Sequence, residues 1–208
     1  MVTPANASSN VVFATSGSDA ELSRDGCYRW WLRRCFADGE GILLFLGLNP
    51  SRAGAQHDDP TLRRLIGFTR QWGYRELLVL NLFARISPSP AALLKVKDPI
   101  GVRNDSFLNR WLKHWSLTPG ADLWCGWGVN GARLDRAQIV LGRIQQLLAE
   151  RKRSVPDSPH PLMLGLTASR QPRHPLYAPR RACLRPLLWA DPELIRHPVN
   201  TLSDVLPH

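Results

Sequence analysis

The chain has 208 residues, 44% of them hydrophobic and 21% charged, which is the composition of a globular protein of about one domain. Its formal net charge is +10 and its pI is near 10.3. This charge favours a polyanionic partner, because neutralised phosphates release condensed counterions. No apolar run approaches the roughly 18 residues that a membrane helix needs, so no membrane partner is expected.

Residues 1–20 are rich in Ser, Thr, Ala and Asn and are predicted to form a flexible leader before a single domain over 21–208. The leader lacks the basic start and apolar core of a signal peptide, so we expect a cytoplasmic protein with reduced thiols. The four cysteines form no Cys-x-x-Cys pair, which removes support for zinc ribbons and thioredoxin chemistry. Four cysteines would suffice for an iron–sulfur cluster, but Cys125 lies in an apolar run and fits a core thiol better. No cofactor is expected.

Hydrophobic periodicity and turn residues predict strands that alternate with helices. The first is an edge strand or hairpin over 27–36, which residues 37–41 turn into a buried strand over 42–47. A helix from 58 to 73 and a buried strand over 77–83 follow, and then a Pro-rich loop over 84–102 with a helical turn at 91–94. The second half has a helix over 107–115, a strand over 121–127, a helix over 134–148 that ends in the basic loop 151–153, a strand over 162–166, and a tail whose residues 184–189 pack on the core. Alternation of this kind predicts an α/β fold, a three-layer α/β/α sandwich around a central four-stranded parallel sheet with right-handed crossovers.

Polar clusters follow each of the four buried strands. They are Asn49-Pro50-Ser51, Asn81, Trp127-Gly128 and Arg173-His174-Pro175. The carboxyl ends of parallel strands share one edge of a sheet, and ligands of open α/β sheets bind there. The sequence therefore predicts one pocket that these clusters line.

The clusters resemble, in order, the motifs of the uracil-DNA glycosylase superfamily over residues 40–180. Gly47-Leu48-Asn49-Pro50 is similar to its Gly-x-Asn-Pro motif, in the form found in mismatch-directed members, and Val79-Leu80-Asn81, Trp127-Gly128 and His174-Pro175-Leu176 are similar to the later ones. The last motif departs from the superfamily's His-Pro-Ser-Pro form. The chain also resembles a widespread bacterial family of uncharacterised proteins that shares Leu-Asn-Pro-Ser, Asp-Asp-Pro-Thr and Arg-His-Pro-Leu-Tyr.

The resemblance implies a uracil-DNA-glycosylase-like fold and a catalytic role for two of these residues. Asn49 would position the attacking water, and His174 would hydrogen-bond a base carbonyl as negative charge develops there. Since an amide cannot take a proton as a carboxylate does, Asp58 or Asp59 would be the substitute base. The simpler interpretation of these two aspartates is a helix cap.

The resemblance also implies residues that bind the base and the DNA. Asn81 would read the Watson–Crick edge of a flipped base, in a pocket lined by Leu48, Ser51 and Trp127. Ser51 replaces the Tyr that bars C5-substituted bases in uracil-specific members, so a pocket for modified pyrimidines is expected. Predicted DNA contacts are the wedge residues Leu176 or Tyr177, together with Pro50, Arg52, Arg63, Arg170 and Arg173. Trp30, Trp31 or Trp127 could stack a base.

The sequence leaves three functions open. The first is a monomeric, metal-free DNA glycosylase that flips out a base and hydrolyses its N-glycosidic bond. The second is a glycosylase-fold module that binds modified or damaged nucleic acid, or a nucleotide, without cutting it. The third is metal-dependent hydrolysis through His57, Asp58 and Asp59.

Overall fold

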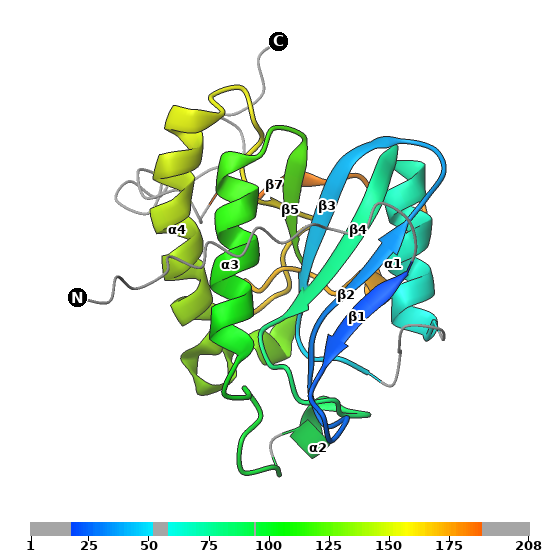
Figure 1. Ribbon diagram of the computed structural model, residues 1–208, viewed down its shortest axis with the longest axis vertical. Coiled ribbons are helices and arrows are strands. Elements are labelled where there is room, and N and C mark those ends of the chain that lie inside the picture. Colours follow the sequence, from blue (N-terminus) through cyan, green and yellow to red (C-terminus); the bar gives the residue numbers. More distant parts are fainter. Residues whose placement is uncertain (1–17, 52–57, 94, 189–208) are drawn as a thin grey trace, which may run out of the picture.

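The computed structural model describes residues 18–51, 58–93 and 95–188, which form a mixed sheet with helices on both faces (Figure 1). The seven strands, in the spatial order β1-β2-β4-β3-β5-β6-β7, are β1 (Asp19–Leu22), β2 (Arg29–Cys35), β4 (Tyr74–Asn81), β3 (Glu40–Gly47), β5 (Ala121–Cys125), β6 (Leu162–Met163) and β7 (Arg185–Pro186). The helices are α1 (Pro60–Gln71), α2 (Pro90–Leu93), α3 (Asn104–Leu117) and α4 (Arg136–Ser154), with 3₁₀ segments η1 (Val129–Asp135) and η2 (Pro175–Tyr177). None of these helices is long and apolar enough to cross a membrane.

The α/β class is confirmed, but the sheet has seven strands rather than four among the described residues. The four predicted strands lie side by side as β4, β3, β5 and β6 and are parallel, whereas β1, β2 and β7 extend the sheet with antiparallel pairs. β2 is not a hairpin partner of β3, because it pairs with β4, where Leu32 lies opposite Val79. β1 begins at Asp19, so the predicted leader is two residues too long, and its residues 1–17 lie outside the described chain.

The predicted end of the last long helix also differs from the structure. The helix α4 continues to Ser154, whereas the sequence predicted that it ends in a basic loop. Arg151 is only 1% exposed and donates hydrogen bonds to the carbonyls of Trp115 and Ala121, the latter at 2.6 Å. The helix continues because this arginine satisfies carbonyls at the end of α3 and the start of β5. The sequence predicted a basic loop here, whereas Arg151 connects α3 and β5 from within the helix.

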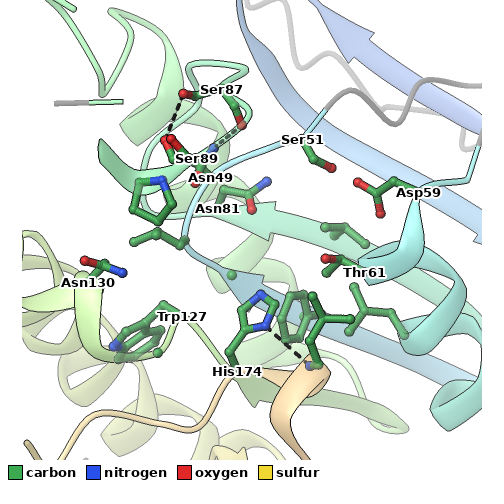
Figure 2. Close-up of a pocket in the computed structure, with 18 of the residues that line it drawn as sticks. Asn49, Ser51, Asp59, Thr61, Asn81, Ser87, Ser89, Trp127, Asn130 and His174 are labelled. Carbon is green, nitrogen blue, oxygen red and sulfur yellow. Dashed lines mark hydrogen bonds between the residues drawn. The ribbon is translucent and has the colours of Figure 1, made fainter. Parts of the chain in front are cut away.

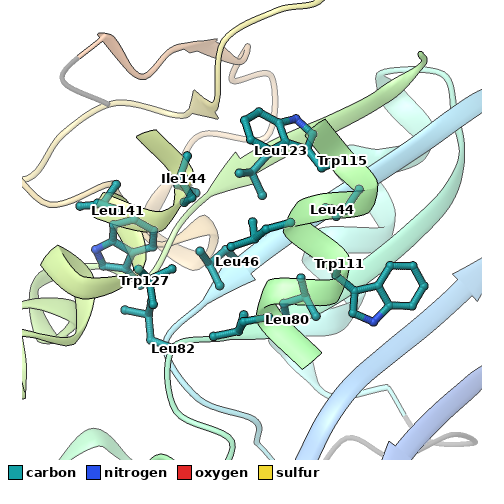
Figure 3. Close-up of a cluster of buried hydrophobic side chains, with 14 of the residues drawn as sticks. Leu44, Leu46, Leu80, Leu82, Trp111, Trp115, Leu123, Trp127, Leu141 and Ile144 are labelled. Carbon is teal, nitrogen blue, oxygen red and sulfur yellow. The ribbon is translucent and has the colours of Figure 1, made fainter. Parts of the chain in front are cut away.

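Each face of the sheet buries its own hydrophobic cluster. On one face Leu44, Leu46 and Leu80 pack beneath α3 and α4, against Trp111, Trp115, Leu141 and Ile144 (Figure 3). On the other face the alternate residues of the same strands pack against α1, through Leu62, Leu65 and Phe68. Strands buried on both faces explain the near-continuous apolar runs in the sequence.

Two buried polar side chains hold the carboxyl end of β4. The Asn104 amide donates to the carbonyls of Asn81 at 3.2 Å and Leu82 at 3.0 Å, and Arg136 Nε donates to the Leu82 carbonyl at 2.7 Å. Asn104 and Arg136 are at most 2% exposed. They satisfy the backbone where the strand leaves the sheet, and so fix the position of Asn81.

We predict that Asn104→Ala lowers the free energy of unfolding by about 2 kcal/mol, because it leaves two buried carbonyls with fewer donors. Urea denaturation followed by circular dichroism measures this. Asn109→Ala, at an exposed position of the same helix, is the matched control and should change the stability by less than about 0.5 kcal/mol. Equal stabilities for the two variants would contradict the role of Asn104.

Candidate active site

The helices that follow β3 and β5 pack on opposite faces of the sheet, α1 after β3 and α4 after β5. Adjacent parallel strands whose connections diverge leave a crevice beyond their carboxyl ends. A pocket of about 610 Å³ occupies this place (Figure 2). The sequence predicted a pocket at the carboxyl ends of the parallel strands, and the structure has a cavity at this edge of the sheet.

The pocket brings together most of the predicted site residues, from five separate parts of the chain. Those that line it are Leu48, Asn49, Ser51, Asp59, Asn81, Trp127, Arg173, His174, Leu176 and Tyr177. The prediction that the strand-end clusters converge is confirmed by this geometry. Roles in catalysis or recognition stay predictions.

Other predicted residues lie away from the pocket lining. Asp58 forms an ion pair with the buried Arg34, with its Oδ1 2.7 Å from Nη2, and Arg63 is exposed and donates to the Asp58 carbonyl. Pro50 is buried and Arg170 is exposed on a turn. Arg52 and His57 lie outside the described residues. The structure thus separates Asp58, which serves an ion pair, from Asp59, which faces the pocket.

Asn49 has its amide nitrogen fixed by the backbone. Nδ2 donates to the carbonyls of Pro50 at 2.9 Å and Ser87 at 3.1 Å, which occupies both of its hydrogens. The Ser87 N–H in turn donates to the Pro50 carbonyl at 3.0 Å. These bonds tie the segment after β3 to the loop after β4, and they leave Oδ1 of Asn49 to accept from a water or a ligand.

Asn81 offers the pocket an amide with unused hydrogen-bonding capacity. The residue is 3% exposed, and its Nδ2 has no hydrogen-bond partner among the described residues. A buried donor without a partner costs about 1–3 kcal/mol unless a ligand satisfies it. In Figure 2 its side chain lies between those of Asn49 and Thr61, within the ring of labelled polar groups.

His174 is held as a neutral imidazole. Burial lowers its pKa to about 4, an effect that attraction to the Asp59 carboxylate only partly opposes. Its Nδ1 accepts from the Leu176 N–H at 3.4 Å, which places the ring proton on Nε2 (Figure 2). The side chain can therefore donate a hydrogen bond at neutral pH without bringing a charge.

Phe45 lines the pocket between two glycines, and the sequence analysis did not identify it. A Cβ at Gly47 would lie 2.8 Å from Phe45 Cε1, and a Cβ at Gly126 would lie 2.6 Å from Cε2. Both strand ends therefore need glycine for this ring to fit. The glycine at each strand end could have indicated this contact from the sequence, because glycine in or beside a strand often marks a place where another group approaches the backbone closely.

Of the three tryptophans predicted as stacking candidates, only Trp127 lines the pocket. It is 1% exposed, and its Nε1 donates to Gln171 Oε1 at 2.8 Å. Trp30 stacks on Tyr28 and Phe107 instead, and Trp31 packs edge-on against Trp111. Trp127 thus forms a fixed wall of the pocket, and its neighbour Gly128 donates to the Pro172 carbonyl at 2.8 Å just before His174.

Arg29 on β2 is a second pocket residue that the sequence did not indicate. It is 4% exposed, and burial lowers its pKa to about 10 despite attraction to Asp59, so it stays charged at neutral pH. The run in which it lies mixes basic and aromatic residues without a clear period, so no pattern marked it. Asp59 also caps α1, since its Oδ1 accepts from the Leu62 N–H at 2.7 Å, as the helix-cap interpretation predicted.

Among the described residues no group of three or more His, Cys, Asp or Glu side chains could hold a metal ion. The cluster His57, Asp58 and Asp59 is tested only in part, since His57 is outside those residues. Of its two aspartates, Asp58 pairs with Arg34 and Asp59 caps a helix. This part of the chain gives metal-dependent hydrolysis no support.

The His174 pKa makes a prediction about stability. Between the ordinary value of 6.5 and the folded value of about 4, the unfolded chain binds more protons than the folded one, so the free energy of unfolding falls as pH decreases through that window. His174→Gln lacks this titration, and its stability relative to the parent should rise towards pH 4. An NMR titration of the imidazole measures the pKa directly. A midpoint near 6.5 would contradict the buried neutral state.

Comparison with known proteins identifies the family of the chain. A family model described as a protein of unknown function, DUF1643, matches residues 29–176, which include every strand-end cluster described above. No curated protein and no solved structure matches the chain. Because the match covers well over half of its length, the chain belongs to the DUF1643 family.

Proposed function

We propose that the protein is a DNA glycosylase that hydrolyses the bond between a flipped base and its sugar. The observation that carries the proposal is one pocket that combines a neutral His174 with Asn81, whose amide nitrogen has no hydrogen-bond partner among the described residues. A base edge carries both donors and acceptors, and an amide can match both. The net charge of +10 suits DNA as the partner. Such an enzyme would act in the cytoplasm as a monomer.

In this proposal the base enters the pocket with its ring against Phe45 and its edge towards Asn81. The Nε2–H of His174 donates to a base carbonyl. When the C1′–N1 bond breaks, its electron pair stays on the base, and charge develops on that carbonyl oxygen. A neutral donor in a buried site stabilises this charge more than the uncharged ground state.

Water would reach C1′ from the Asn49 side of the pocket. Asn49 Oδ1 accepts one water hydrogen and so aligns the water oxygen, since its amide nitrogen is already fixed by two carbonyls. The water oxygen bonds to C1′ as the base leaves, and its proton passes to the Asp59 carboxylate. Arg29, which also lines the pocket, stays cationic at neutral pH.

Two apolar side chains at the mouth fit the role of a wedge. Leu176 is 44% exposed and Tyr177 is 79% exposed, and both line the pocket that the base would enter. Large exposed apolar residues at a pocket mouth indicate a partner that covers them. A base stack with one nucleotide missing is such a partner, because a side chain replaces the lost stacking.

The second candidate, a module that binds without cutting, is favoured by the bonding of Asn49. Its two bonds to the Pro50 and Ser87 carbonyls are those of a residue that fixes a loop, and such a role needs no catalysis. In that case the pocket would hold a modified base or a nucleotide with its glycosidic bond intact. The two candidates differ in one product, the abasic site.

We predict that Asn49→Ala and His174→Ala each lower the rate of base release about a hundredfold while DNA binding is kept. The assay uses oligonucleotides that contain uracil, thymine or glycosylated hydroxymethylcytosine, with alkaline cleavage of abasic sites as the readout. Asn109→Ala, on the exposed side of α3, is the control. No abasic product from any of these DNAs, with binding retained, would leave the binding module as the function.

Ser51 lines the pocket, and its small side chain leaves room for a base substituent. We predict that Ser51→Tyr preserves release of uracil but lowers release of C5-substituted pyrimidines by at least about tenfold, since a clash in a packed pocket costs about 1–3 kcal/mol. Competition between the two substrates in one reaction measures the ratio. Equal losses for both would show that Ser51 does not face the C5 position, and release of uracil alone by the parent protein would contradict the wide pocket.

A further inference from the structure

A second groove, of about 700 Å³, runs along α1 and shares one lining residue with the pocket. One face of α1 lines it, with Arg63, Arg64 and Gly67 at helical spacing, and the segment after η2 lines its other side. Leu176 belongs to the lining of both the groove and the pocket. The pocket and the groove therefore adjoin at this side chain.

The groove is positively charged. The described residues that line it include three arginines, Arg63, Arg64 and Arg180, and no carboxylate. Arg64 is held in place, because its guanidinium lies 4.7 Å over the Phe68 ring and donates to the Ala178 carbonyl. An arginine that is already ordered loses less entropy when it binds phosphate oxygens.

Gly67 leaves the middle of the helix face without a side chain. A Cβ placed on it would meet no atom within 4 Å, so the space above it is open groove. Glycine costs an exposed helix roughly 1 kcal/mol relative to alanine, and nothing in the packing of α1 requires it here. A requirement that the groove stay open for a ligand would explain why glycine stands at position 67.

We propose that this groove binds the sugar–phosphate backbone of the DNA strand that flanks the flipped nucleotide. The assignment of DNA as occupant rests on the proposed function, while the charge and the open helix face are properties of the groove itself. Arg63, Arg64 and Arg180 contact phosphates. Leu176 separates the flipped nucleotide from the strand that continues along α1.

Gly67→Leu tests the groove by filling it. A Cβ at this position meets no atom within 4 Å, and leucine has a higher helix propensity than glycine, so the fold should be kept. Its matched control is Gly142→Leu, since Gly142 is a helical glycine of α4 with equally open space around its Cβ position. Arg180→Gln removes one groove charge, and Arg110→Gln on the exposed side of α3 is its control.

The probe is a fluorescein-labelled oligonucleotide of about 16 nucleotides with one central uracil, single-stranded or paired, with binding followed by fluorescence anisotropy over a range of salt. Gly67→Leu should weaken binding at least about tenfold, and Arg180→Gln should lower the slope of log affinity against log salt by about one. Both controls should bind as the parent does.

Two outcomes separate this proposal from the proposed function. If Gly67→Leu binds and releases base as the parent protein does, the groove proposal is wrong and the glycosylase stands. If the parent releases no base from any DNA, yet Gly67→Leu and Arg180→Gln lose binding relative to their controls, the groove proposal stands and the glycosylase is wrong. A parent protein that does not bind the probe in either form overturns the groove proposal.

Discussion

The structure depends on how the chain leaves β3. The helix that follows it, α1, packs on one face of the sheet, while α4, which follows the neighbouring strand β5, packs on the other face. Such divergence leaves a crevice between the two strand ends, and Phe45 fits there only because Gly47 and Gly126 lack side chains. The pocket is thus a consequence of topology, and its floor is set by two glycines.

Around this floor, each polar residue is positioned by a different part of the chain. Asn104 and Arg136 fix the end of β4 and with it Asn81, whereas the Ser87 carbonyl fixes the amide of Asn49. The neutral state of His174 comes from burial beside Gly128 and Pro175. Independent supports of this kind suit chemistry that depends on orientation more than on a strong base.

The sequence predicted the parallel strands and the convergence of their polar ends, because long apolar runs and strand-end turn residues are local patterns. It could not predict that β2 pairs with β4, since strand pairing depends on contacts far apart in the chain. Arg29 and Arg151 were missed for a related reason. Charged residues are expected at the surface, and only the fold reveals the carboxylate or carbonyls that allow them to be buried.

The central claim is that the pocket holds a flipped base against Asn81 and His174. A crystal structure of the Asn49→Ala variant with an oligonucleotide that contains uracil or a C5-substituted pyrimidine tests it most directly. The account predicts the base in the pocket, its edge within hydrogen-bonding distance of the Asn81 amide, and Leu176 or Tyr177 in the vacated place of the stack. DNA bound at another face with all of its bases stacked would contradict it.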